Sequence, residues 1–186
     1  MREYPVIDGR LHAAFFCYIR WMDGQQMLPD ETVLKILGSD CSREPVSGDV
    51  LGKDRAYGLS HGGWRLLAGD YSYSLWRMAK SHWPMCLIEL SKGAEVFAYT
   101  RPDAELAHEF IYVRAGEILR ERVVESPGWT DQVVVLDFGD PMAGESRQLQ
   151  QDVADQIGLE LAVGLGIPRR QRRDGLRQYR LKPRAS

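Results

Sequence analysis

Five short apolar segments joined mostly by short links constrain the fold of this chain more than any other feature. They are rich in Val, Ile, Phe and Tyr, which favour strands, and they span residues 85–90, 95–100, 109–114, 117–124 and 132–138. Three of the links hold turn-forming residues and are shorter than the dozen residues that a parallel crossover needs. The pattern predicts an antiparallel meander, in which the charged middle of 117–124 suits an edge or solvated strand.

Other elements are expected before this region. In residues 11–22 both sets of alternating positions are mostly apolar, so both faces of a strand would carry apolar side chains. This pattern predicts a strand that is covered on both faces. Residues 29–38 begin near two acids and end at Gly38, which is typical of a short helix. Residues 39–63 are rich in Gly, Ser and Asp and show no periodicity, so a long loop is expected. A short strand is expected at 64–67.

Two helices are expected in addition. One begins at Asp70 or Ser72 and ends at Pro84. The other begins near Gly144 and carries apolar side chains four residues apart, and Gly158 either ends it or kinks it. Together with the strands, these helices predict an α+β fold: a mostly antiparallel β-sheet (meander) with helices packed on one face.

The length of 186 residues suits a single domain, which we place at residues 1–168, followed by a basic C-terminal tail at 169–186. The tail holds eight Lys or Arg residues and one acid, whereas the whole chain has a net charge of −2. The body is therefore acidic and would repel a polyanion, so only the tail could bind nucleic acid. Tyr179 and Leu181 supply apolar surface in the tail. We therefore expect part of the tail to pack against the domain.

The chain has three cysteines, an odd number, and none of them is in CxxC spacing, so a framework of disulfide bonds is not expected. This favours a reducing compartment. The N-terminal residues lack the pattern of a signal peptide, and no apolar run approaches the length of a membrane span. A cytoplasmic protein without a membrane partner is expected.

No complete catalytic, metal or nucleotide motif is present, so neither a cofactor nor a metal ion is expected. Asp137 and Asp140 flank Phe-Gly, and they could serve as a carboxylate pair for a metal or for proton transfer, although a turn is the more frequent reason for such a pattern. His61, beside Ser60 and two glycines, could contribute to acyl transfer or could simply precede a strand. Cys17 lies in an apolar strand and is expected to be buried rather than nucleophilic.

Aromatic residues gather beside an acid at 69–76. Tyr71, Tyr73 and Trp76 with Asp70 suit a protein-binding patch, in which Tyr and Trp are enriched. The alternative is that these aromatic side chains pack on the sheet.

The order of several stretches resembles a group of bacterial immunity-type proteins. The stretches that carry the resemblance are GWRLLAGDYSYSLWRMAKSHW, ELSKGAEVFAYT, YVRAGEILRE and DFGDPMAGE, within residues 64–145 approximately. The resemblance implies a cytoplasmic antitoxin that binds and neutralises a cognate toxin or effector by blocking its active site, without catalysis. It transfers no site residue and does not include the basic tail.

An immunity protein is therefore the leading hypothesis, with a cognate toxin or effector as partner. The acidic body would suit a basic partner through electrostatic steering. Its proposed contact residues are Asp70, Tyr71, Tyr73, Trp76, Asp137 and Asp140. One alternative is a nucleic-acid-associated protein that uses its basic tail. Another is a small enzyme whose site assembles from distant residues such as His61, Asp137 and Asp140.

Overall fold

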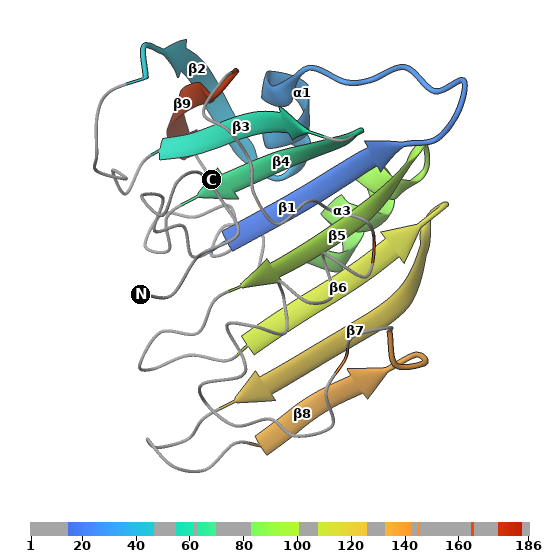
Figure 1. Ribbon diagram of the computed structural model, residues 1–186. Helices are drawn as coiled ribbons and strands as arrows, with labels where there is room; N and C mark the ends of the chain where they lie inside the picture. Colours follow the sequence, from blue (N-terminus) through green and yellow to red (C-terminus); the bar gives the residue numbers. More distant parts are fainter. Residues whose placement is uncertain are drawn as a thin grey trace.

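In a computed structural model, the protein is built on a single antiparallel sheet of nine strands (Figure 1). The structure describes residues 15–46, 55–61, 63–69, 83–100, 108–125, 133–142, 145, 165 and 175–183. The strands are β1 (Phe15–Trp21), β2 (Ser39–Glu44), β3 (Arg55–His61), β4 (Trp64–Gly69), β5 (Ala94–Thr100), β6 (His108–Arg114), β7 (Glu117–Glu125), β8 (Val133–Phe138) and β9 (Arg177–Pro183). Their order in the sheet is β2-β9-β3-β4-β1-β5-β6-β7-β8, so the meander predicted for the strands from residue 95 to 138 is confirmed.

Strand β1 lies at the centre of the sheet and is covered on both faces, as its sequence predicts. It pairs with β4 on one side and β5 on the other. Alternate side chains enter two separate buried clusters, with Phe15, Cys17 and Ile19 in one and Phe16 and Tyr18 in the other. Side chains that alternate between the two faces of a mostly apolar strand thus contribute to both buried clusters.

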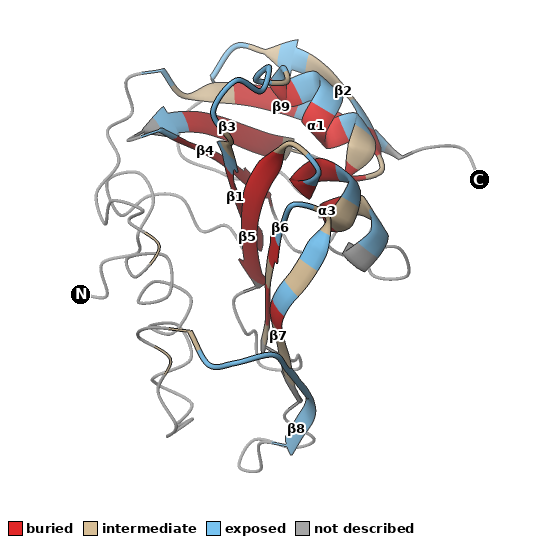
Figure 2. Ribbon diagram, turned by 90° about the vertical axis from the view of Figure 1, so that its right-hand side faces the viewer, coloured by how far each residue is buried: buried red, intermediate tan, exposed pale blue. Residues whose placement is uncertain are grey.

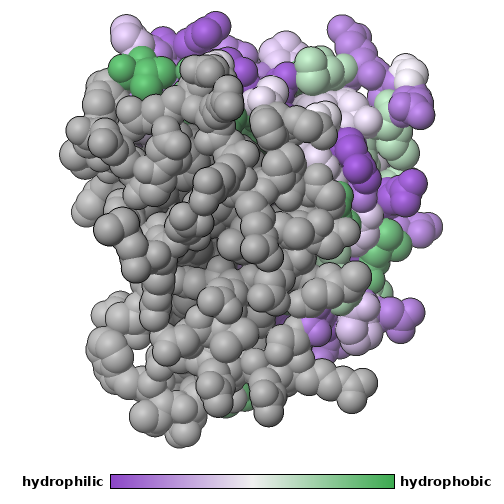
Figure 3. Space-filling view, viewed as in Figure 1, coloured by the Kyte–Doolittle hydropathy of each residue, from purple (hydrophilic) through white to green (hydrophobic). Residues whose placement is uncertain are grey.

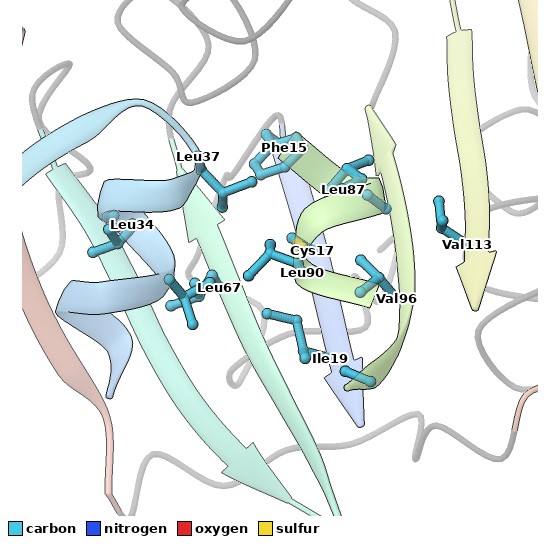
Figure 4. Packing of buried hydrophobic residues seen from close by; sticks show 14 of the residues in the cluster. Phe15, Cys17, Ile19, Leu34, Leu37, Leu67, Leu87, Leu90, Val96 and Val113 are labelled. Carbon is cyan, nitrogen blue, oxygen red and sulfur yellow. The ribbon is translucent and has the colours of Figure 1, made fainter. Parts of the chain in front are cut away.

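The two described helices are α1 (Asp30–Ile36) and α3 (Trp83–Ser91). Leu34 and Leu37 around the end of α1, and Leu87 and Leu90 of α3, belong to the same buried cluster as Phe15 of β1 (Figure 4). The other two segments expected to be helical, 70–82 and the region after Gly144, lie almost entirely outside the described residues. That helices cover one face of the sheet therefore stays a prediction for the whole chain.

The long loop predicted for residues 39–63 is wrong for two stretches. Ser39–Glu44 is β2, and Arg55–His61 is β3. Strand β2 is polar along its length, and it is a strand because all of its residues pair with β9, from Ser39 opposite Pro183 to Glu44 opposite Gln178. Because β9 lies well over a hundred residues away in the chain, the sequence around β2 carries no pattern that predicts this pairing.

The strand predicted at residues 85–90 is also wrong, because this segment lies in α3. Six mostly apolar residues without polar alternation fit a buried strand and a buried helix equally well. Pro84 is the second residue of α3 and does not end a helix there. The fixed φ of proline suits the first turn of a helix, where its missing N–H costs nothing.

The edge strand at the end of the meander is β8, and β7 lies inside the sheet. Strand β7 pairs with β6 and with β8, so the prediction that its charged middle marks an edge strand is wrong. The side chain of Arg120, in that charged middle, is 2% exposed. Strand β8 occupies the edge, and all six of its residues are exposed, at the end of the sheet farthest from β2 and β9 (Figure 2).

Part of the segment expected to be a basic tail belongs to the sheet. Arg177–Pro183 is β9, which lies between β2 and β3. Tyr179 and Leu181 are buried, which confirms that they hold this segment on the domain. The domain boundary at residue 168 lies outside the described residues and stays a prediction.

None of the helices in the described part of the chain is long and apolar enough to cross a membrane.

Candidate functional site

The edge strand β8 exposes more apolar surface than any other described strand. Val133, Val134, Val135, Leu136 and Phe138 are all exposed, and Val135 retains 50% of its accessible surface. Leu119 of the neighbouring β7 is exposed as well. Elsewhere in the described part, large exposed apolar side chains are scattered singly at Met27, Val46 and Met85. Contiguous exposed apolar residues of this kind typically mark an interaction site.

The described residues that are visible on one face of the molecule are more polar than this strand (Figure 3). On the face that Figure 3 shows, the described residues along the upper and right-hand margins are mainly hydrophilic, with smaller apolar patches between them. We use the name β8 edge for the exposed strand Val133–Phe138 together with Asp140.

The two acids predicted to act as a pair lie at one end of the β8 edge. The carboxylate of Asp137 is half-exposed and accepts a hydrogen bond from Nη1 of Arg120. Asp140 is exposed and follows the bend at Gly139. Strand β8 thus ends before a turn, as the pattern favoured. Because Asp137 is already paired with a cation, it is a poor choice for a general base or a metal ligand.

The side chain of Arg120, in β7, holds the end of β8 through several hydrogen bonds. Its Nε donates to Oε2 of Glu145 over 3.0 Å, and its Nη2 donates to the other carboxylate oxygen of the same residue. Its Nη1 also donates to the carbonyl oxygens of Phe138 (2.8 Å) and Gly139 (3.1 Å). All these partners lie in or just after β8. One buried guanidinium therefore ties the end of the edge strand and the turn after it to β7.

Glu145 is the acid of this cluster, and its side chain is 3% exposed. It also accepts a hydrogen bond from Arg122 and one from the backbone N–H of Met142. Burial raises the pKa of its carboxyl group, but the hydrogen bonds from Arg120 and Met142 outweigh burial, and the net pKa lies below its ordinary value. The sequence analysis did not identify Arg120 and Glu145 as a pair, because 24 residues separate them in the chain.

Gly139 is required where it lies. Its φ is +82°, and a Cβ atom there would lie 2.0 Å from the backbone oxygen of Leu119. The turn after β8 therefore packs directly against the backbone of β7. Only glycine satisfies both conditions.

The groups proposed for a small enzyme do not come together. His61 ends β3, whereas Asp137 lies in β8, and six strand spacings separate the two strands in the sheet. At the usual spacing of strands this corresponds to roughly 30 Å. Cys17 is fully buried, as predicted, and burial raises the pKa of its thiol to about 12, which keeps it un-ionised.

A second buried ion cluster lies at the opposite end of the sheet. The carboxylate of Asp30 accepts hydrogen bonds from Arg65 (2.7 Å), from Arg177 (2.6 Å) and from the hydroxyl of Tyr179 (2.8 Å). It lies against Gly58, where a Cβ atom would be 2.2 Å from its Oδ2. These hydrogen bonds fasten β9 and α1 to the sheet.

A third cluster joins neighbouring strands. Glu95 accepts hydrogen bonds from Arg20 and from the hydroxyl of Tyr112, and Arg20 lies over the ring of Trp64. Burial, followed by the hydrogen bond to Glu95, raises the pKa of Tyr112 to about 12. These groups satisfy one another across β1, β5 and β6, which is the pattern of a structural network.

The predicted aromatic patch, Asp70 with Tyr71, Tyr73 and Trp76, lies outside the described residues. Among the residues that the structure does describe, no group of three or more His, Cys, Asp or Glu side chains is placed to hold a metal ion. Searches against models of known families, against curated proteins and against solved structures found no match to this chain. The β8 edge is therefore the candidate site that the described geometry favours.

Proposed function

We propose that this chain is an immunity-type protein that binds a cognate bacterial toxin or effector in the cytoplasm and blocks its active site, without catalysing a reaction. The observation that carries the proposal is the β8 edge, an exposed strand with five apolar side chains beside two acids. A monomeric protein gains nothing from exposing such a strand to water, whereas a binding protein uses it as the centre of an interface.

The acids of the β8 edge suit a basic partner. Asp137 and Asp140 are exposed, and residues 133–142 contain no Lys or Arg. Complementary charge speeds the encounter between two proteins and selects among partners, which a neutralising protein needs. The resemblance noted in the sequence supports the same function.

A nucleic-acid-binding role for the basic C-terminal segment has less support. Arg177 is paired with Asp30, and Arg180 is paired with Glu44. Their charges are therefore largely neutralised within the domain and are poorly available for phosphate groups.

A growth assay tests the proposal. The product of the neighbouring gene is induced alone and together with this chain, and the complex is purified through a tag on this chain. We expect the neighbouring product to stop growth, and co-expression to restore growth and yield a stable complex. A neighbouring product that is harmless, or one that remains toxic and unbound, would contradict the proposal.

A further inference from the structure

We infer that the β8 edge binds an extended segment of its partner as an additional strand of the sheet, and that this segment alternates apolar with basic residues. The identity of that partner as a toxin rests on the proposed function. The pairing itself rests on three observations: the outer backbone of β8, with which no described strand pairs, the apolar side chains along it and the sign of the charge beside it.

The first observation is the position of β8 in the sheet. Strand β8 pairs with β7 through Val133 to Phe138, and no other described strand pairs with it. In an antiparallel pair, only part of the backbone N–H and C=O groups point toward the partner, and the remainder point outward. The outward groups of an edge strand are a ready template for another strand.

The second observation is that β8 lacks lysine and proline, two of the residues that normally protect an edge, although its pairing with β7 shifts register at Val135. Proteins commonly blunt exposed edge strands with lysine or proline. Val133–Phe138 contains neither, and it is continuously apolar except for Asp137. A strand laid alongside would cover apolar side chains on both faces of the sheet, because successive side chains of a strand point to opposite faces.

The third observation is the charge. Arg120 pairs with Asp137 and Glu145, and Arg122 pairs with Glu145, so the two cations and two acids of this cluster offset one another. Asp140 is exposed just after β8, and residues 133–142 contain no Lys or Arg. The charge that the β8 edge adds beyond this cluster is therefore the acidic charge of Asp140. A second copy of this chain would bring Asp137 and Asp140 again, so a basic segment is the better complement.

The probe for this inference is a synthetic peptide of seven alternating Lys and Val residues with capped ends and a fluorescent label. Its binding to the full chain is measured by fluorescence anisotropy at low salt. Two control peptides isolate the two parts of the inference. One carries an N-methyl group on every backbone nitrogen and can donate no ladder hydrogen bond from either of its edges, and the other has Glu in place of Lys.

The chain offers a matched pair of variants. Val135→Lys places a cation in β8, whereas Val46→Lys changes the same residue type at an exposure of 52%, outside β8. Asp140→Lys is a second variant that alters charge without altering the strand itself. Urea unfolding midpoints confirm that all three variants fold.

We expect the Lys-Val peptide to bind at least tenfold more tightly than either control peptide. Val135→Lys and Asp140→Lys weaken its binding at least tenfold, and Val46→Lys changes it less than twofold. Equal binding of the N-methylated peptide would overturn strand pairing, and equal binding of the Glu peptide would overturn the basic partner. Light scattering that shows a dimer, lost in Val135→Lys, would assign the edge to a second copy instead.

The growth assay separates this inference from the proposed function. Protection by the wild-type chain combined with failure of the peptide to bind would reject strand pairing and leave the immunity function standing. Peptide binding at β8 combined with failure to protect would reject the immunity function and leave the edge as a strand-binding site.

Discussion

Arg120 is a buried cation whose described hydrogen-bond partners are residues of β8 and the turn after it. A charge in such a position is tolerated because five hydrogen bonds to Glu145, Asp137, Phe138 and Gly139 use the donors of its guanidinium. Removing a partner leaves the cation buried and incompletely paired, which costs more than the pair contributes by itself. At the scale of single residues, this cluster fixes the end of the β8 edge.

Substitution of Glu145 by glutamine should therefore destabilise the protein. We expect Glu145→Gln to lower the free energy of unfolding by about 2–3 kcal/mol at pH 7, somewhat less than for complete loss of partners, because Asp137 and two carbonyl groups remain. Urea denaturation provides the measurement. The matched control is Glu89→Gln, whose exposed pair with Lys92 contributes at most about 1 kcal/mol.

The same variant should change how stability depends on pH. The pKa of Glu145 is lower in the folded state than its ordinary value, so the unfolded state takes up the proton first as the pH falls. The stabilisation by this carboxylate is complete above the unfolded pKa of about 4.3 and is lost as the pH falls through the lower folded pKa. Wild type and Glu145→Gln should converge in stability below pH 4. A constant difference between them from pH 7 to pH 3 would contradict this role.

Gly139 tests how closely the turn after β8 lies against β7. We expect Gly139→Ala to cost at least about 2 kcal/mol more than Gly24→Ala, because overpacking against backbone is added to the strain of a positive φ. Gly24 has a φ of +77° and nothing within 4 Å of an added Cβ atom, so it isolates the strain. Equal losses in thermal or urea unfolding would mean that the close approach to Leu119 is not present.

At the scale of elements, the sequence predicted strands well where they were apolar and close to their partners in the chain. Strands β4, β5, β6, β7 and β8 lie within one or two residues of their expected bounds, and β1 ends one residue before its expected end, while residues 11–14 of the expected strand lie outside the described part. Strand β2 was missed because it is polar and depends on β9 for pairing. Helix α3 was mistaken for a strand because a short apolar run carries no period that distinguishes the two.

The candidate site shows the same limit. Asp137 and Asp140 were identified from the sequence, and they lie in β8 and just after it, while their role in binding a partner stays a prediction. The exposure of Val133–Phe138 could not be predicted, because a continuous run of Val and Leu is typical of a strand buried on both faces. Only the order of strands in the sheet shows that this run lies at an edge.

Strand β9 gives a prediction about a whole element. Ending the chain before Arg177 removes an interior strand, and it leaves β2 and β3 without their shared partner. We expect this truncation to abolish cooperative unfolding, measured by circular dichroism in urea. The control Lys182→Ala removes an exposed charge of β9 and should change stability by less than about 0.5 kcal/mol. A truncated chain as stable as the wild type would show that β9 is an appendage.

At the scale of the whole molecule, the charges at the two ends of the sheet have different uses. Basic residues of β9 are paired with Asp30 and Glu44, so the C-terminal segment acts partly as a counter-charge within an acidic body. At the other end, the acids of the β8 edge face solvent beside apolar side chains. A charged and apolar edge at one end of a closely paired sheet supports the proposal that this chain binds another protein.

The most direct measurement is the growth assay with the matched lysine variants. If the product of the neighbouring gene is toxic, as the proposed function expects, wild type and Val46→Lys should restore growth against it, because Val46 lies outside the β8 edge. Val135→Lys should lose protection while its unfolding midpoint stays close to that of Val46→Lys, since Val135 is half-exposed in the free protein. Full protection by a folded Val135→Lys variant would contradict the claim that the β8 edge neutralises the toxin.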